Sequence, residues 1–522
     1  MDSPLQWLLA AFATIFLLAT FLRNKKAARR GKGRRKLPEP SFAWPIIGNF
    51  HLLAANDRLP HKVLGDMADK YGPIFGLRLC AHRVFVVSDS RIAKECLTVN
   101  DRALAGRPKA IASEHIGYNY ADIALCPPNL FWRDVRKVVV LELLSSRRLE
   151  ALRRVRESGV KRFTQEIYRR WATEKKKKND CFSGEVIKLD MSEWFGRLII
   201  GVMLQIMFGH RYEDVGSSVA ATLRRNFELL GLSVVGDFLP WLRWLDIGGY
   251  EKAIKENTKE MDDVVDCWLQ QHSRKRNTKP KEEQDFMDAL ISHYDSDKEI
   301  PNGYDADTAI KATCTGVLSA AIDTTTTTLI WALSLVLNNG DVLDKIRNEL
   351  DSNVGRERHV NESDLNNLTY IQAVVKETLR LYPPGPLLVP HKAVEDCVVD
   401  GYHVSKGTRL LVNVAKIQRD PKFWSDPDAF KLDRFLTEQK EVEVKGNHFD
   451  LLPFGSGRRM CPGVSLGLQS VELGLASVIH GFDIRRSLDE KIDMTEAAGL
   501  SVTKATPLEA LLTPRLPLHL YS

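Results

Sequence analysis

Residues 454–463 read FGSGRRMCPG, and this stretch decides the fold. An apolar, helix-like run follows it from Val464 to Ile479, so Cys461 lies just before a helix start. At such a position the unpaired N–H groups and the helix dipole favour a thiolate over a thiol. A lone cysteine would more simply be a buried residue in a tight turn, but the full string favours a cysteine that does chemistry.

The residues around Cys461 suit a flat, charged cofactor. Phe454 can shield a flat apolar partner, Arg459 can meet a carboxylate, and glycines such as Gly463 let the backbone approach closely. A phosphate-binding GxGxxG loop does not fit, because Met460 stands where the third glycine belongs. The set suggests haem with a cysteinate ligand, which pushes electron density onto iron and promotes O–O cleavage.

The stretch is the haem-binding signature FxxGxRxCPG, and the chain resembles a cytochrome P450. The motifs NYA at 119–121, DFMD at 285–288 and LSLVLN at 333–338 are similar to plant microsomal members, closest to the group numbered eighty-two. The resemblance implies a mostly α fold with minor β-sheets, haem b (iron protoporphyrin IX) as cofactor, and Cys461 as the axial iron ligand.

A second motif, ETLR, pairs Glu377 with Arg380 on one helix face, because residues three apart in a helix are neighbours. The same spacing recurs at surface positions, but here PPGP at 383–386 ends the helix abruptly. The resemblance implies a lock between this pair and Arg434. The matching segment, FKLDRF at 430–435, has Leu and Asp where Pro and Glu are more usual. We assign this triad a structural role.

The segment AAIDTT at 320–325 is the candidate for oxygen activation. It lies inside a long helical pattern. A threonine hydroxyl can bond back to the carbonyl one turn earlier and open the helix locally. The resemblance assigns Thr324 to a hydrogen bond with the bound oxygen and Asp323 to proton delivery. Ala321 replaces the glycine that is commonest in the family. The alternative is a threonine-rich packing face.

Several cations are candidates for holding the haem propionates. The segment WRDVR at 132–136 resembles WxxxR and directs Trp132 and Arg136 to a propionate, although an amphipathic helix alone would give the same pattern. Arg459 is the second partner. His391 is the third, because the family often has a basic residue there.

The variable segments that line the substrate side in this family are mostly apolar or aromatic here, which suits a lipophilic substrate. The candidate substrate contacts are Tyr118, Tyr120, Ala320, Ala321, Leu387, Leu388, Val389 and Leu500. The stretch Phe238 to Leu245 either belongs to this surface or dips into a membrane.

The N-terminus predicts a membrane anchor. Residues 5–22 are 18 residues without a charge, and nine basic residues follow between 23 and 36. Of the net charge of +7, removing those nine leaves −2. A cleaved signal peptide carries its charge before the apolar run, and a nucleic-acid role is disfavoured because the basic run abuts an apolar span. We predict a transmembrane anchor at 1–22, a basic and proline-rich linker at 23–49, and a haem-thiolate catalytic domain at 50–522.

The rest of the composition is that of a large helical enzyme. The 522 residues are 44% hydrophobic and 27% charged, which excludes a disordered or collagen-like chain. The eight cysteines show no CxxC pair and no zinc pattern, so we predict no structural disulfide.

Periodicity predicts most helices and strands. The predicted helices are 147–171, 191–208, 250–271, 305–338, 341–352 and 370–381. The predicted strands are 74–79, 83–87, 397–404 and 409–413. Polar breaks at 174–180 and 272–283 read as loops.

The resemblance implies an NADPH- and O2-dependent monooxygenase that hydroxylates a lipophilic plant specialised metabolite, such as an alkaloid, terpenoid or phenolic. It implies NADPH–cytochrome P450 reductase as partner, docked on bases such as Arg133 and Lys137, and the endoplasmic reticulum membrane as location, single-pass with the catalytic domain in the cytosol. The same centre could instead cleave or demethylate its substrate. A non-catalytic haem-binding membrane protein is a more distant alternative.

Overall fold

Two long apolar helices run through the centre of the protein, α9 (Met191–Phe208) and α14 (Ala306–Asn338). By length and hydropathy each is able to cross a membrane, but both are 72% buried inside the protein. A helix that is apolar on all sides is typical of a protein core. The computed structural model describes residues 35–54, 58–177, 186–210, 212–275, 284–294 and 300–521. The predicted anchor at 1–22 lies outside them.

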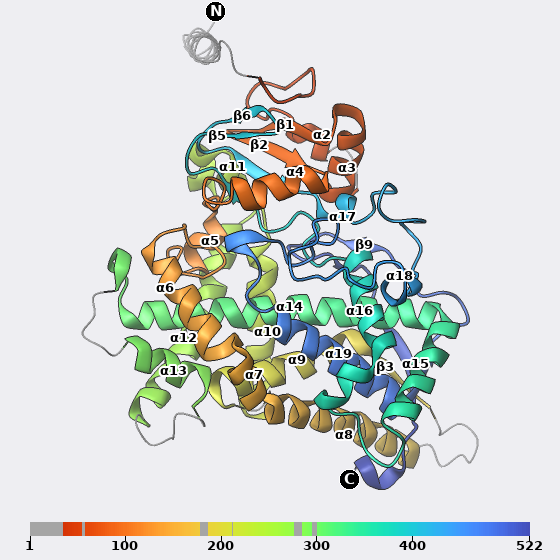
Figure 1. The fold of residues 1–522 in the computed structure, drawn as a ribbon. Coiled ribbons are helices and arrows are strands. Elements are labelled where there is room, and N and C mark those ends of the chain that lie inside the picture. The colour runs from red at the N-terminus through yellow and green to blue at the C-terminus, as the bar shows by residue number, and fades with distance from the viewer. Residues whose placement is uncertain are drawn as a thin grey trace, which may run out of the picture.

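Helices pack around α14 from several directions (Figure 1). They are α8 (Arg153–Lys177), α10 (Tyr212–Leu230), α12 (Tyr250–Arg274), α13 (Phe286–Tyr294), α15 (Gly340–Asn353), α16 (Thr369–Leu381) and α19 (Val464–Gly481). All of these except α8, together with α9, contact α14 directly. The shorter helices are α2 (Phe50–Ala54), α3 (Pro60–Tyr71), α4 (Ser90–Lys94), α5 (Ile111–His115), α6 (Leu130–Val139), α7 (Ser146–Ala151), α11 (Val235–Phe238), α17 (Val414–Ile417) and α18 (Asp433–Leu436).

The strands form small sheets at the edges of this helical body. The largest has the order β1 (Ile74–Leu79), β2 (His82–Val87), β7 (Arg409–Val412) and β4 (His391–Lys392), with only β2 and β7 parallel. In Figure 1 it lies with α2 and α3 at the upper end of the molecule. The others pair β3 (Ile187–Asp190), β11 (Glu509–Pro514) and β8 (Phe482–Arg486), then β9 (Glu496–Ala497) with β10 (Thr503–Lys504), and β5 (Cys397–Val399) with β6 (Tyr402–Val404).

The structure confirms the mostly helical class and most predicted elements. Helix α9 and strand β1 have the predicted bounds, whereas the predicted helix 147–171 is divided into α7 and α8, and the predicted strand 397–404 is a hairpin. The predicted loop at 174–180 is wrong at its start, because α8 continues to Lys177. The seven cysteines of the described residues are free thiols, and Cys181 lies outside them.

Candidate active site

The loop that carries Cys461 is shaped by two glycines with left-handed backbones. Gly455 has φ +66° and Gly457 has φ +68°, a region that other residues seldom adopt. A Cβ on Gly457 would lie 2.2 Å from the carbonyl oxygen of Leu97, so no side chain fits there. The backbone N–H of Cys461 donates to the carbonyl of Phe454 at 3.0 Å and closes the loop just before α19. Phe454 itself is half-buried against the main core.

Cys461 is exposed, although protein atoms surround its thiol on many sides. The surrounding protein raises the pKa of the thiol through burial. The Gly463 backbone N–H and the charge of Arg136 lower that pKa, but they do not outweigh burial. The expectation that the helix start alone favours a thiolate is therefore wrong for the unligated chain. A bound metal cation deprotonates such a thiol outright.

Helix α14 also has accessible residues near its middle. Ala320 is exposed in the middle of a helix whose neighbouring turns are mostly buried, and Ala321 and Thr324 are half-buried. The Thr324 hydroxyl donates to the Ala320 carbonyl at 2.7 Å, as expected, but α14 stays helical from end to end, so the predicted local opening is absent. An alanine accessible inside a core helix marks the wall of a cavity.

Asp323 combines burial with an unpaired oxygen. Its Oδ2 is buried and accepts no hydrogen bond among the described residues. Burial raises the pKa of Asp323 to about 6, the nearby Ser501 hydroxyl lowers it, and Glu228 raises it further. A carboxyl that titrates near neutral pH can both accept and release a proton under working conditions.

Arg459 is held in place by three contacts. Its guanidinium lies 4.2 Å from the ring centroid of Trp132, Nε donates to the Ala105 carbonyl at 2.9 Å, and Nη2 donates to the Cys126 carbonyl at 2.5 Å. Nη1 is buried with no partner among the described residues. Burial lowers the pKa of Arg459 to about 10, so it stays charged at neutral pH.

Trp132 and Arg136, both on α6, support the cysteine loop. Arg136 Nη2 donates to the carbonyl of Met460, the residue before Cys461, at 2.7 Å. The Trp132 indole N–H donates to the Ile123 carbonyl at 3.1 Å. Trp132 therefore acts here as a stacking surface between two guanidinium groups, with Arg136 5.8 Å from its ring, and its donor is already used.

Sequence reasoning missed Arg107, a third guanidinium beside this group. It donates to the carbonyls of Val389 and Pro390, and burial together with Arg459 lowers its pKa to about 9. The sequence offers one sign of it: Arg107 directly follows residues 103–106, a run of small and apolar residues.

His391 is buried, and its Nδ1 donates to the Leu104 carbonyl at 2.9 Å. Burial and the neighbouring arginines lower its pKa to about 3, so in this arrangement it is neutral.

Glu377, Arg380 and Arg434 meet in the core. Arg380 Nε and Nη2 donate to the two Glu377 oxygens at 2.6 and 2.8 Å, and Arg434 Nε lies 3.4 Å from Glu377 Oε1. All three side chains are at most 3% exposed. Arg380 also donates to the carbonyls of Pro427 and Ala429, and thereby fixes the chain that leads to the cysteine loop.

The candidate substrate contacts separate into two groups. Ala320, Ala321, Val389, Leu388 and Leu500 are accessible or half-buried, and a Cβ on Gly455 would lie 3.6 Å from Leu388. Tyr118 and Tyr120 instead direct their hydroxyls to Asp262 of α12 and to Glu114 of α5, and Leu387 packs with the β1–β2 cluster. These contacts place the hydroxyls of Tyr118 and Tyr120 beside α12 and α5, and the role of all eight residues in substrate binding stays a prediction.

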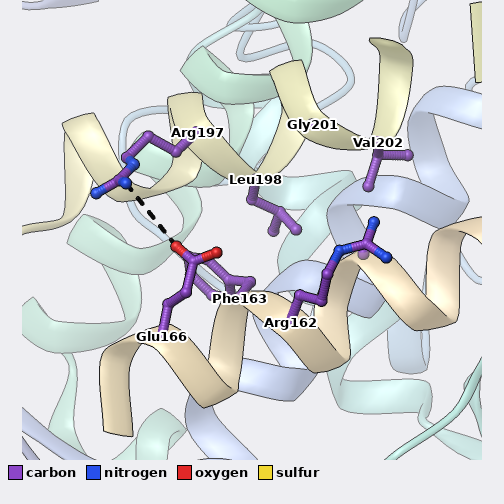
Figure 2. Close-up of a pocket in the computed structure, with 8 residues that line it drawn as sticks. Arg162, Phe163, Glu166, Arg197, Leu198, Gly201 and Val202 are labelled. Atoms are coloured by element: carbon purple, nitrogen blue, oxygen red, sulfur yellow. Dashed lines mark ion pairs between the residues drawn. The ribbon is translucent and has the colours of Figure 1, made fainter. Parts of the chain in front are cut away.

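Two other features of the structure do not belong to this site. The hollow between α8 and α9 in Figure 2 measures about 30 Å³ and is lined by Phe163, Leu198 and the weak pair Arg197–Glu166 at 3.9 Å.

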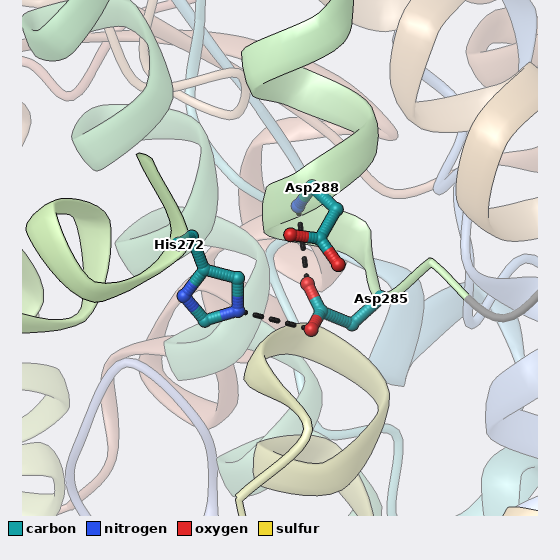
Figure 3. A group of neighbouring side chains, drawn as sticks. All are labelled: His272, Asp285 and Asp288. Carbon is teal, nitrogen blue, oxygen red and sulfur yellow. Dashed lines mark hydrogen bonds and ion pairs between the residues drawn. The ribbon is translucent and has the colours of Figure 1, made fainter. Parts of the chain in front are cut away.

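The group of His272, Asp285 and Asp288 in Figure 3 has ligand types that suit a metal. However, His272 Nδ1 donates to the Trp268 carbonyl, and Nε2 lies 3.0 Å from Asp285. Burial opposes a charge on His272, but the hydrogen bond and charge of Asp285 outweigh it and raise the pKa, which favours the imidazolium form. This group is an ion pair that joins α12 to α13.

The arginines and the cysteine of this site fit a flat dianionic group with a metal at its centre. Arg107, Arg136 and Arg459 are like charges gathered at partly or wholly buried positions, and one N–H of Arg459 lacks a protein partner. Such a cluster calls for an anion. Cys461 lies just before α19, a helix that packs on α14, and α14 carries the exposed Ala320. Haem satisfies both requirements.

The family model for cytochrome P450 matches residues 38–511. The chain belongs to the cytochrome P450 family. It is 47% identical over 491 residues to demethylepipodophyllotoxin synthase of Sinopodophyllum hexandrum, with 92% of each chain covered. It is 42% identical to xanthotoxin 5-hydroxylase CYP82C4 of Arabidopsis thaliana, with 100% of each chain covered. The similarity to the plant group numbered eighty-two is thereby confirmed.

Solved structures agree with this assignment. A zebrafish cytochrome P450 with abiraterone has a TM-score of 0.73 and 26% identity, and the match covers 87% of this chain and 99% of that chain. This P450 is a haem-containing monooxygenase that works with O2, a redox partner and a lipophilic substrate.

Proposed function

We propose that this P450 hydroxylates a lipophilic plant specialised metabolite, with electrons supplied from NADPH by NADPH–cytochrome P450 reductase. The single observation that carries the proposal is the exposed Cys461 just before α19, in a loop that Arg136 contacts through the Met460 carbonyl. Bound haem with a cysteinate ligand supplies the O–O cleavage chemistry. The protein's own side chains bind the haem, orient the substrate and deliver protons.

Cys461 would hold the haem iron in this proposal, and Phe454 and Gly463 shape its surroundings. Arg459 would offer a propionate its Nη1 atom, which has no partner among the described residues, while Trp132 stacks on its guanidinium and Arg136 and Arg107 add positive charge nearby. His391 contributes a donor only when a facing carboxylate raises its pKa enough to protonate the second ring nitrogen. Glu377, Arg380 and Arg434 have a structural role, because they are buried away from accessible space.

Proton delivery is assigned to Asp323 and Thr324. Asp323 accepts a proton at Oδ2, where no protein donor competes, and its pKa near 6 lets it release that proton again. Thr324 donates to the Ala320 carbonyl at rest, so its oxygen keeps lone pairs for a proton received from the acid.

A lipophilic substrate is supported by the apolar character of the accessible residues. Ala320, Ala321, Leu388, Val389 and Leu500 carry no charge, and a pocket lined in this way gains free energy mainly from apolar burial. Xanthotoxin 5-hydroxylase, by its name, oxidises such a compound. The chemical class of this protein's substrate therefore lies among ring-containing phenolics, terpenoids and alkaloids.

The domain division is an anchor at 1–22, a linker at 23–49 and a catalytic domain at 50–522, held single-pass in the endoplasmic reticulum membrane with the catalytic domain in the cytosol. Exposed aromatic residues at one end of the fold support the proposal that the protein contacts membrane lipid. Trp44, Trp241 and Trp244 are 51%, 55% and 79% exposed. The rings of Phe50 and Phe238, 5.3 Å apart, join the segments that carry them. Aromatic rings of this kind favour a membrane interface.

The reductase docks on the outer face of α6 in this proposal. Arg133 and Lys137 are exposed one turn apart, on the helix whose Arg136 contacts the cysteine loop. Complementary charge steers and orients such an encounter.

The test is turnover by microsomes that contain the full chain and reductase, against panels of flavonoids, terpenoids and alkaloids. Product that contains one atom of labelled O2 is the expected result. Thr324→Ala should lower product formed per NADPH consumed. Wild-type turnover that yields no oxygenated product across the panels, or a Thr324→Ala variant with unchanged coupling, contradicts the proposed roles.

A further inference from the structure

A row of polar residues follows one ridge of α14 toward Asp323. Lys311, Thr315, Ser319 and Asp323 stand at intervals of four, and side chains at this spacing are neighbours on a helix. Thr315 and Ser319 are 2% and 4% exposed. Several other hydroxyls of α14 bond back to the helix's own carbonyls, so a row of hydroxyls that leads to a buried acid needs a separate explanation.

Two buried asparagines continue this row onto neighbouring helices. Asn257 of α12 donates through Nδ2 to Asn226 Oδ1 at 3.3 Å, and Asn226 of α10 donates through Nδ2 to Ser319 Oγ at 3.2 Å. Both asparagines are at most 2% exposed. We call Thr315, Ser319, Asp323, Asn226 and Asn257 the polar column.

The polar column has hydrogen-bonding capacity that the described protein atoms do not use. Thr315 Oγ1, Asn257 Oδ1 and Asp323 Oδ2 are buried and have no partner. Leaving such atoms unpaired costs free energy, and proteins usually place internal water against them. These three oxygen atoms can each accept a hydrogen bond from an internal water molecule.

Two hydroxyls of the polar column also differ from others on α14. The hydroxyls of Thr313, Thr324, Thr328 and Ser334 each donate to the carbonyl one turn earlier. Neither Thr315 nor Ser319 makes this bond among the described residues, so their protons remain available. A hydroxyl that accepts on one side and donates on the other can pass a proton along.

The outer end of the polar column opens on the surface. A hollow of about 390 Å³ lies between α5, α12 and α14, and its lining includes Tyr118, Thr258, Asp262 and Lys311. Tyr118 and Lys311 both donate to Asp262 Oδ1 at 2.9 Å. Thr258 Oγ1, next to Asn257 in the chain, is a further buried atom without a partner. This outer hollow can hold solvent within one helical turn of Thr315.

We propose that the polar column is hydrated and conducts protons from the outer hollow to Asp323. The proposal rests on the proton-delivery role assigned to Asp323 above. Thr315 and Ser319 each accept one proton and donate another, while Asn226 and Asn257 position the intervening water. The net change is one proton removed from solvent in the outer hollow and one gained by Asp323 Oδ2, which then passes it toward Thr324.

The test compares Thr315→Val and Ser319→Ala with Ser334→Ala in the haem-loaded full chain. Ser334 is a matched control, because it is a buried α14 hydroxyl outside the polar column. Infrared titration of the resting protein follows the carboxyl band that disappears in Asp323→Asn. Loss of water raises the pKa of a buried acid, so both column variants should move the midpoint to higher pH, and the control should not.

Turnover gives the second readout, using the panel compound that the wild type oxidises best. Each column variant should lower product per NADPH about fivefold and increase the solvent isotope effect, since one hydrogen-bonded link is lost. If both variants keep the wild-type midpoint, coupling and isotope effect while Asp323→Asn loses coupling, the polar column is refuted and the role of Asp323 stands. If Asp323→Asn also keeps its coupling, the proposed function fails as well.

Discussion

Replacing Glu377 by glutamine would leave two buried arginines without a counter-ion. Glu377 and Arg380 are both 0% exposed, and Arg434 is 3% exposed. Removing one partner of a buried ion pair costs about 3–5 kcal/mol, because the remaining charge stays in a low-dielectric interior. A domain of this kind is stable by only about 5–15 kcal/mol, so the change removes a large share of its stability.

The chain contains a matched control for this change. Glu150 and Arg153 have the same spacing and a contact of 2.8 Å, but their side chains are 64% and 36% exposed. Glu150→Gln should therefore cost about 0–1 kcal/mol. Urea unfolding of the haem-loaded protein, followed by the Soret band and by circular dichroism, measures both. If the two variants lose equal stability, the assignment of a buried structural triad is refuted.

Three further predictions concern the site. Burial raises the pKa of Asp323 from 3.8 to about 6, so its contribution to stability falls as pH rises between those values; Asp323→Asn should flatten that part of the stability-versus-pH curve, and an unchanged slope would refute the shift. Arg459→Gln removes a charged donor, and haem transfer to apomyoglobin should become faster by about tenfold or more; transfer at the wild-type rate would exclude Arg459 as a propionate partner. Gly457→Ala places a Cβ 2.2 Å from the Leu97 carbonyl and should abolish the folded holoprotein, whereas Gly467→Ala on α19 meets no atom within 4 Å and should be tolerated; equal yields of both would contradict the geometry of the loop.

Features fixed by local sequence were predictable. Helix α9 and strand β1 follow from periodicity and flanking breaks, and the spacing of Glu377 and Arg380 places them on one face of a helix. Cys461 stands in a contiguous motif, so its position needs no knowledge of distant contacts. These predictions depend on residues within about ten positions of one another.

Features that depend on the whole fold were not predictable. Arg107 joins Arg459 only because chain segments more than 350 residues apart meet, and Asn226 reaches Ser319 from another helix. The pKa of Cys461 was misjudged because the helix dipole is a local effect, whereas desolvation sums over every surrounding segment. The hydroxyl of Tyr118 similarly pairs with Asp262 of a distant helix, a contact that the local sequence does not indicate.

Every role proposed for this site depends on the Sγ atom of Cys461 as the iron ligand. The decisive measurement is the reduced carbon monoxide difference spectrum of purified wild-type protein and of Cys461→Ser at matched haem content. The wild type should show the strongly red-shifted Soret band of a haem-thiolate, and Cys461→Ser should lose both that band and turnover. A serine variant that keeps the shifted band would contradict the ligand assignment and every role built on it.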